Sequence, residues 1–209
     1  MKYLHFNEID ITRYELIGFD MDGTLYEEQK FVEQAYKRVA NYLSTESGEV
    51  IYNWMLQRWV EKGSSYPYIF SESIEKFQIS GIEVSELLNI YRETLPQLKL
   101  QDNIVQLLNY IDVHKAFLIT DGNPRLQRNK YQALGLDKYF LESNCGFTGD
   151  LGMQYYKPNI EILNHIQCFN ENRKILYFGD RDIDEQFANA ACIDFMLVKD
   201  FKKFWSELK

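Results

Sequence analysis

Acidic and polar side chains are concentrated in four short segments that lie far apart along the chain. The segments are Asp20-Met-Asp-Gly-Thr24, Thr120-Asp-Gly-Asn123, Lys157-Pro158 and Gly179-Asp-Arg-Asp-Ile-Asp184. Carboxylates that crowd together repel one another unless a cation lies among them. Aspartates, backbone carbonyls and waters are the ligands that Mg²⁺ prefers, and hydroxyl, ammonium and amide groups suit a phosphoryl group. These residue types therefore predict phosphate chemistry at a magnesium site.

The sequence places no histidine, cysteine or serine among these segments as a nucleophile. An aspartate is then the available nucleophile, because carboxylates do form covalent intermediates in enzymes that handle phosphate. The residue types alone thus indicate chemistry through an aspartyl-phosphate.

The segments need a scaffold that brings them together, and the hydrophobic pattern predicts one. Short apolar runs at 16–19, 116–119, 175–178 and 195–198 are typical of buried strands. We expect helices between them at 103–113, 124–134, 159–168 and 185–191, with Pro124 and Pro158 at the first helical positions. Alternating strands and helices predict an α/β fold with a doubly wound parallel sheet, whose carboxyl edge carries the ligand site.

Between Gly23 and Gln101 the sequence contains eleven glutamates and no aspartate. Glutamate favours helix interiors more than aspartate does, so this stretch is predicted to be wholly helical. Apolar periodicity supports helices near 32–43, 51–60, 73–79 and 84–95, with Ser80 and Glu83 as a capping box for the last. We therefore expect an α/β core domain at 1–26 plus 98–209 and an inserted helical domain at 27–97.

Composition limits the class of protein. The net charge is −8 at pH 7, so a nucleic-acid polymer is an unexpected partner. No apolar run is long enough to cross a bilayer, and the charged first ten residues do not resemble a secretion signal. Three widely spaced cysteines fit free thiols rather than a disulfide framework. We expect a cytoplasmic protein that does not bind membranes.

Taken in order, FDMDGTL, LIT, YKP and GDRDID resemble the four motifs of the haloacid dehalogenase (HAD) superfamily of phosphohydrolases. The helical insertion between the first two motifs is similar to the C1 cap of subfamily I. The resemblance extends from about Glu15 to Val198 and implies a Rossmann-like core, a Mg²⁺ cofactor and a small phosphorylated metabolite as substrate.

The resemblance also implies a role for each motif residue. Asp20 is the expected nucleophile, and Asp22 the acid that protonates the leaving oxygen and the base that activates water. Residues i and i+2 of an extended segment point the same way, so both carboxylates can reach one phosphoryl group. The remaining roles follow the motifs: phosphate binding by Thr120, Asp121, Gly122 and Lys157; metal binding by Asp20, the Asp22 carbonyl and Asp180; support of the site by Thr24 and Asp184.

Several assignments stay open at this point. Asn123 is either a turn residue or a substrate contact, and Asp182 is either a solvated charge at a helix start or part of the metal surroundings. Arg181 stands where a small residue is common. A sugar-phosphate mutase of the same superfamily uses the same groups, and an idle member would only bind. Seven aromatic residues between Tyr52 and Phe77 could stack on a nucleobase, but we expect them to fill the core of the helical domain.

Overall fold

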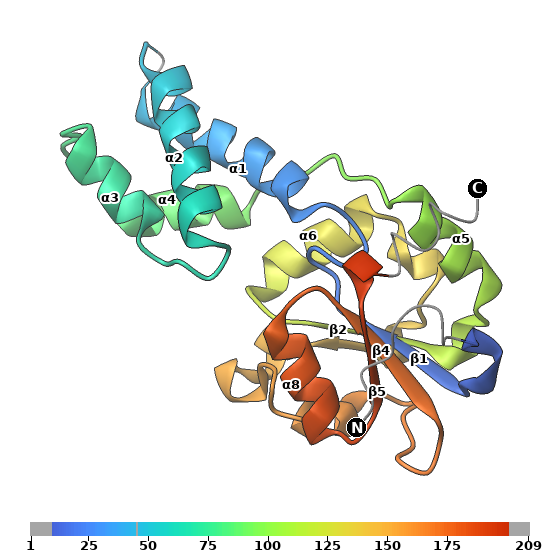
Figure 1. Cartoon of the computed structure of the whole chain (residues 1–209). Coiled ribbons are helices and arrows are strands. Elements are labelled where there is room, and N and C mark those ends of the chain that lie inside the picture. Colours follow the sequence, from blue (N-terminus) through green and yellow to red (C-terminus); the bar gives the residue numbers. More distant parts are fainter. Residues whose placement is uncertain (1–9, 45, 201–209) are drawn as a thin grey trace. The chain divides into compact units, whose positions relative to one another are not determined.

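The computed structural model describes residues 10–44 and 46–200 (Figure 1). The first nine residues, in which we expect no secretion signal, lie outside the described residues. Contacts divide the chain into two compact units, Glu28–Gln97 and the remainder of the chain. The assignment of these units as a cap and a core domain stays a prediction.

The larger unit is built on a parallel sheet of five strands in the order β3-β2-β1-β4-β5. The strands are β1 Leu16–Phe19, β2 Ala116–Thr120, β3 Cys145–Phe147, β4 Ile175–Gly179 and β5 Asp194–Leu197. Phe19 pairs with Leu118 of β2 and Phe178 of β4, so β1 lies at the centre. The predicted doubly wound α/β fold is confirmed. Edge strand β3 was not predicted, because three residues are too few to show a periodicity.

Four α-helices connect these strands in the described part of the larger unit. They are α5 Asp102–Tyr110, α6 Pro124–Ala133, α7 Thr148–Leu151 and α8 Asp182–Ala190. Pro124 stands at the first turn of α6, as its fixed φ angle and missing N–H predict.

The prediction of a helix opened by Pro158 and spanning 159–168 is wrong. Only a short 3₁₀ helix, Glu161–His165, forms there. The Oδ1 atom of Asn159 accepts the backbone N–H of Glu161 at 2.8 Å. This local side-chain bond stabilises a turn in competition with a helix. The segment after Lys157 therefore offers no helix N-terminus to an anion.

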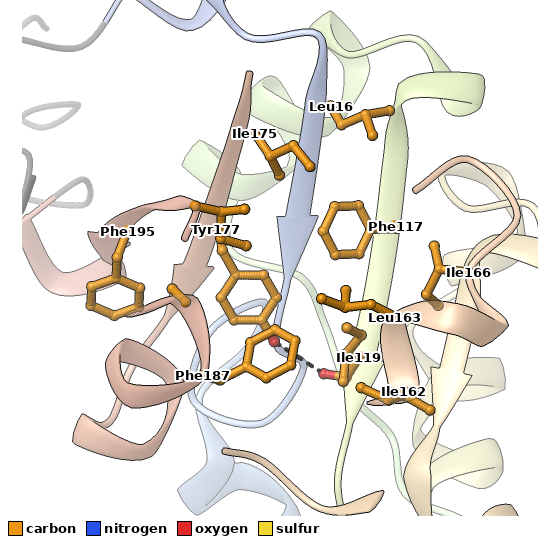
Figure 2. Close-up of a cluster of buried hydrophobic side chains, with 12 residues drawn as sticks. Leu16, Phe117, Ile119, Ile162, Leu163, Ile166, Ile175, Tyr177, Phe187 and Phe195 are labelled. Carbon is orange, nitrogen blue, oxygen red and sulfur yellow. Dashed lines mark hydrogen bonds between the residues drawn. The ribbon is translucent and has the colours of Figure 1, made fainter. Parts of the chain in front are cut away.

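Buried side chains cover both faces of the sheet. On one face, alternating strand residues pack against α8 and the 3₁₀ helix Glu161–His165 (Figure 2). That cluster consists of Leu16, Phe117, Ile119, Ile162, Leu163, Ile166, Ile175, Tyr177, Phe187, Ala188, Ile193 and Phe195. On the other face, the ring of Phe19 stacks on Phe178 at 5.1 Å and meets Phe140 edge-on at 5.8 Å. Because both faces of the sheet are buried, polar side chains are left to the ends of the strands.

The smaller unit contains helices α1 Glu28–Leu43, α2 Gly48–Lys62, α3 Ile69–Lys76 and α4 Val84–Arg92. The prediction that this stretch is wholly helical is confirmed. Its core includes an aromatic cluster in which Tyr91 meets Phe31, Tyr36 and Phe70. The proposed capping box of Ser80 is wrong, because α4 starts later and the side chain of Glu86 accepts the N–H of Glu83 at 2.9 Å.

The seven aromatic residues between Tyr52 and Phe77 do not all fill this core. Phe70 is buried, Tyr68 is 59% exposed, and the other five are partly exposed. Trp54 meets Phe77 edge-on, and Tyr66 meets Tyr68 in the same way. Of the seven, Phe70 alone is buried in this core, and a substrate contact of the other six stays a prediction. No helix in the described residues is long and apolar enough to span a membrane.

Candidate active site

The carboxyl ends of β1, β2 and β4 lie at one edge of the sheet and carry the predicted site residues. Asp20 directly follows β1, Thr120 ends β2 and Asp180 directly follows β4. Lys157 reaches the same edge from the loop before the 3₁₀ helix. Asp20 and Thr120 are each 1% exposed, and Lys157 is 5% exposed. Residues from all four sequence segments therefore meet in one buried polar site.

Lys157 bridges two carboxylates. Its Nζ atom donates to Oδ1 of Asp20 and to Oδ1 of Asp184, both at 2.5 Å. Burial disfavours the charged ammonium, but Asp20 and Asp184 outweigh burial and raise the pKa of Lys157 well above its ordinary value. The lysine is therefore a fixed positive charge against the expected nucleophile.

Three carboxylates at this edge could hold a metal ion. One oxygen atom from each of Asp20, Asp180 and Asp184 lies within 4.8 Å of the others. Burial raises the pKa of Asp20, and the neighbouring charges of Asp184 and Asp180 raise it further against the opposing effect of Lys157. A cation among these oxygens would relieve that repulsion, so the donor set fits a hard metal ion.

Two glycines let the acidic loops approach this closely. Gly23 has a φ angle of +74°, and a Cβ atom there would lie 2.1 Å from a carboxylate oxygen of Asp180. A Cβ atom on Gly179 would lie 2.3 Å from the Cβ atom of Asp184. Asp184 is thereby fully buried, and its Oδ2 atom accepts the backbone N–H groups of Asp180 and Arg181 at 3.3 and 3.2 Å. Asp184 thus shapes the loop that carries Asp180.

Asp22 has partners of its own, separate from those of Asp20. Its Oδ1 atom accepts the Nζ–H of Lys130 at 2.8 Å and the hydroxyl of Tyr26. Its Oδ2 atom accepts the Nε2–H of Gln127 at 2.7 Å. Burial opposes ionisation, but Lys130 and these hydrogen bonds prevail and lower the pKa of Asp22.

The sequence patterns did not indicate Tyr26, Gln127 or Lys130 as site residues. Gln127 and Lys130 stand three residues apart on α6, so they share one helix face, and both are buried. Helix periodicity could have placed them together, but not which way that face points. Their position depends on how α6 crosses the sheet.

Asp121 does not direct its carboxylate at a phosphate. Oδ1 accepts the hydroxyl of Thr148 at 2.8 Å, and both oxygens lie within 3.3 Å of the backbone nitrogen of Lys157. Burial raises the pKa of Asp121. The side chain of Asp121 therefore ties the loop after β2 to the turn that carries Lys157. The phosphate contact predicted for Asp121 is one of its backbone amide, not of this carboxylate. Gly122 follows with a φ angle of +128°, a conformation that favours glycine.

The other candidate residues are placed as follows. The hydroxyl of Thr24 donates to Oδ2 of Asp20 at 3.3 Å. Oδ1 of Asn123 accepts the N–H of Leu126 at 3.2 Å, so the side chain of Asn123 caps the N-terminus of α6. A contact between Asn123 and a substrate stays a prediction. Asp182 is exposed at the first position of α8, where it favours the helix dipole. The Nε atom of Arg181 lies 3.7 Å from Oδ1 of Asp180.

Comparison with known proteins decides the family. The model of the haloacid dehalogenase-like hydrolases matches residues 14–191. The chain belongs to this hydrolase family. None of the curated proteins compared with it matches its sequence significantly.

Solved structures share the fold at low sequence identity. The magnesium-bound HAD hydrolase YfnB of Bacillus subtilis is 19% identical with a TM-score of 0.61, over 88% of this chain and 86% of YfnB. A Thermotoga maritima protein assigned as a β-phosphoglucomutase is 20% identical with a TM-score of 0.57, over 87% and 83% of the two chains. L-2-haloacid dehalogenase of Xanthobacter autotrophicus is 15% identical with a TM-score of 0.57, over 87% and 76%. The fold thus accommodates several chemistries, and the site residues must distinguish them.

Proposed function

We propose that this HAD hydrolase is a Mg²⁺-dependent phosphatase that hydrolyses a small phosphomonoester through a covalent aspartyl-phosphate on Asp20. The observation that carries the proposal is the pairing of two aspartates, two residues apart, with two different buried lysines. Lys157 bonds to Asp20, and Lys130 bonds to Asp22. Separate partners allow the two carboxylates to perform separate tasks.

The first half of the reaction uses Asp20 as nucleophile. A carboxylate oxygen of Asp20 forms a bond to phosphorus while the bond from phosphorus to the leaving oxygen breaks. The negative charge of the bound phosphate offsets the effect of Lys130 and favours the protonated form of Asp22, which gives its proton to the leaving oxygen, so the alcohol departs neutral. The ammonium of Lys157, 2.5 Å from Asp20, reduces the repulsion between an anionic nucleophile and an anionic phosphate.

The second half releases phosphate. Asp22, now ionised, takes a proton from a water molecule whose oxygen forms a bond to phosphorus. The bond between phosphorus and the Asp20 oxygen breaks, and the free carboxylate and inorganic phosphate are restored. The hydroxyl of Thr120 and the amides of Asp121 and Gly122 hold the phosphoryl oxygens during both halves.

The site fits a magnesium ion by its donor chemistry. Among the described residues, the edge gathers five aspartates (Asp20, Asp22, Asp121, Asp180 and Asp184) against two buried lysines. The Asp20 and Asp180 carboxylates and the backbone carbonyl of Asp22 would hold Mg²⁺, with Asp184 beside them. When bound, the ion supplies positive charge that offsets the phosphate and its nucleophile.

Two relatives suggest other chemistries for the same fold. A mutase would keep the aspartyl-phosphate from water and pass the phosphoryl group to a second hydroxyl. A dehalogenase would use Asp20 against carbon, and its halide would leave without a proton. Because a dehalogenase needs no acid, the presence of an aspartate at position 22 supports phosphate chemistry rather than dehalogenation.

The deciding experiment measures phosphate release from a panel of nucleotides, sugar phosphates and phosphoglycolate with purified full-length protein. We expect turnover that requires Mg²⁺, stops with a chelator and is absent from Asp20→Asn. Each reaction is also analysed for loss of substrate without phosphate release.

Substrate conversion without phosphate would replace the phosphatase with a mutase. Halide release from a 2-haloacid, with no reaction on any phosphate, would replace it with a dehalogenase. Metal binding without any turnover would leave only a binding role.

A further inference from the structure

Helix α6 supplies two of the three side-chain donors that hold Asp22. Lys130 and Gln127 both project from one face of this helix to the carboxylate of Asp22, more than a hundred residues earlier in the sequence. The side chain of Lys130 is 5% exposed and that of Asp22 is 11% exposed. Burial of a lysine is costly unless a carboxylate or hydrogen bonds compensate it. The buried ion pair between Lys130 and Asp22 is therefore a specific part of the site and not a chance surface contact.

The two oxygens of Asp22 are held unequally. Among the described residues, Lys130 and Tyr26 both donate to Oδ1, and Gln127 alone donates to Oδ2. A carboxylate oxygen has room for about two hydrogen-bond donors. Oδ1 is therefore filled, and Oδ2 keeps one lone pair for a proton.

Gln127 also connects Asp22 to the phosphate-binding hydroxyl. Its Nε2 atom lies 2.7 Å from Oδ2 of Asp22 and 2.5 Å from Oγ1 of Thr120. An amide nitrogen carries two hydrogens, so one donates to each oxygen. The opposite amide orientation would place its carbonyl oxygen against a carboxylate and is excluded by repulsion. One side chain thus fixes the spacing between the expected acid and a group that holds the phosphoryl oxygens.

We propose that Lys130 and Gln127 are positioning residues: Lys130 anchors Oδ1 of Asp22, and Gln127 sets Oδ2 against Thr120, so that Oδ2 is the atom that exchanges a proton with the leaving oxygen. The inference rests on the proposed phosphatase function and adds how its acid is aimed. Proton transfer needs the acid within hydrogen-bond reach of the leaving oxygen, and a shift of about 1 Å costs roughly a hundredfold in rate.

The test compares two esters that differ only in how much the leaving group needs a proton. p-Nitrophenyl phosphate releases an acidic phenol that departs as an anion, whereas phenyl phosphate releases a more basic one. The kcat/KM value reports the steps up to transfer of the phosphoryl group to Asp20, and so excludes the later hydrolysis. Gln127→Met removes both donors without changing charge, and Gln132→Met is the matched control on the exposed side of α6.

We expect Gln127→Met to lose roughly tenfold to a hundredfold more kcat/KM on phenyl phosphate than on p-nitrophenyl phosphate, with Gln132→Met unchanged on both. Lys130→Met is expected to show the same bias, and Lys130→Arg to recover part of it. Circular dichroism of each variant checks that it is folded. If Lys130→Met does not fold, the Gln127 pair still decides the matter.

Equal losses on both esters, or no loss on either, would overturn the positioning role and leave the phosphatase assignment standing. Wild-type protein that hydrolyses neither ester nor any phosphate in the panel would overturn the proposed function, and this inference with it.

Discussion

The carboxylate of Asp121 accepts the backbone N–H of Lys157, at 3.2 and 3.3 Å from its two oxygens, across 36 residues of sequence. The loop after β2 and the turn that carries the lysine are therefore fixed to each other. The hydroxyl of Thr148 strengthens this link, because it lies 2.8 Å from the same carboxylate and 3.1 Å from the carbonyl oxygen of Thr120. Lys157 meets Asp20 only if this turn stays in place.

Asp121→Ala is predicted to weaken both folding and turnover. It leaves the buried N–H of Lys157 without its acceptor, while the hydroxyl of Thr148 keeps the carbonyl oxygen of Thr120, and the loss costs about 1–3 kcal/mol in the free energy of unfolding. Displacement of Lys157 should lower kcat by roughly tenfold to a hundredfold. Urea unfolding and phosphate release measure the two effects. Thr148→Val, which keeps the bond to Lys157, should cost only about 1 kcal/mol and little activity; an equal loss of kcat would contradict this account.

Asp20→Asn is predicted to abolish turnover without unfolding the protein. An amide cannot accept the phosphoryl group as a carboxylate does, so kcat should fall by a factor of roughly 10⁴ or more. Two changes in stability oppose each other: the bond to the ammonium of Lys157 weakens, and repulsion from Asp180 and Asp184 disappears. We therefore expect the free energy of unfolding to change by less than about 2 kcal/mol. Phosphatase activity retained by a purified, folded variant would rule out Asp20 as nucleophile.

The sequence predicted the strands that carry the site, because each ends in polar residues immediately after a fully buried run. Leu16–Phe19 is the clearest case, with all four residues buried and Asp20 directly behind. The partners of Asp22 could not be predicted from the sequence. A lysine such as Lys130 within a helix is typical of a solvated face, and only the packing of α6 against the sheet turns it inward. The helix predicted at 159–168 was wrong for the converse reason: the hydrophobic pattern allowed a helix, but the side-chain bond of Asn159 stabilises a turn there instead.

The ion pair between Glu72 and Arg58 predicts a pH dependence within the helical unit. Arg58 holds Glu72 with two hydrogen bonds, at 2.7 and 2.9 Å, and with the hydroxyl of Tyr66 it lowers the pKa of Glu72 to about 2 from 4.5. A carboxyl group whose pKa is lower in the folded state stabilises the fold above its unfolded pKa. That stabilisation should be lost as the pH falls from about 4.5 towards about 2.

Urea midpoints of the wild type and Arg58→Met, compared at several pH values, test this dependence. The wild type should be the more stable near neutral pH, and the difference should shrink below about pH 4.5 as Glu72 takes up a proton. Lys76→Met, which removes an exposed charge elsewhere in the same unit, serves as control. A difference that stays constant down to pH values near 3 would mean that Arg58 stabilises the unit by packing alone.

Magnesium should stabilise the folded protein, because the clustered carboxylates of Asp20, Asp180 and Asp184 repel one another without a cation. At a concentration 100 times its Kd, a ligand that binds only the folded state adds about 2.7 kcal/mol to the free energy of unfolding. We therefore expect the Tm to rise with Mg²⁺ and to return to its starting value with a chelator.

Two variants separate the metal ligands from the acid. Asp180→Ala should lose the Mg²⁺-dependent rise in Tm and the heat of binding in calorimetry, since it removes a predicted ligand. Asp22→Asn should keep both while losing most of its turnover, because its predicted ligand atom is the backbone carbonyl, which the substitution leaves in place. If Asp22→Asn lost metal binding and Asp180→Ala kept it, the ion would have to be held by the Asp22 side chain, and the three donors that now surround that carboxylate would need another explanation.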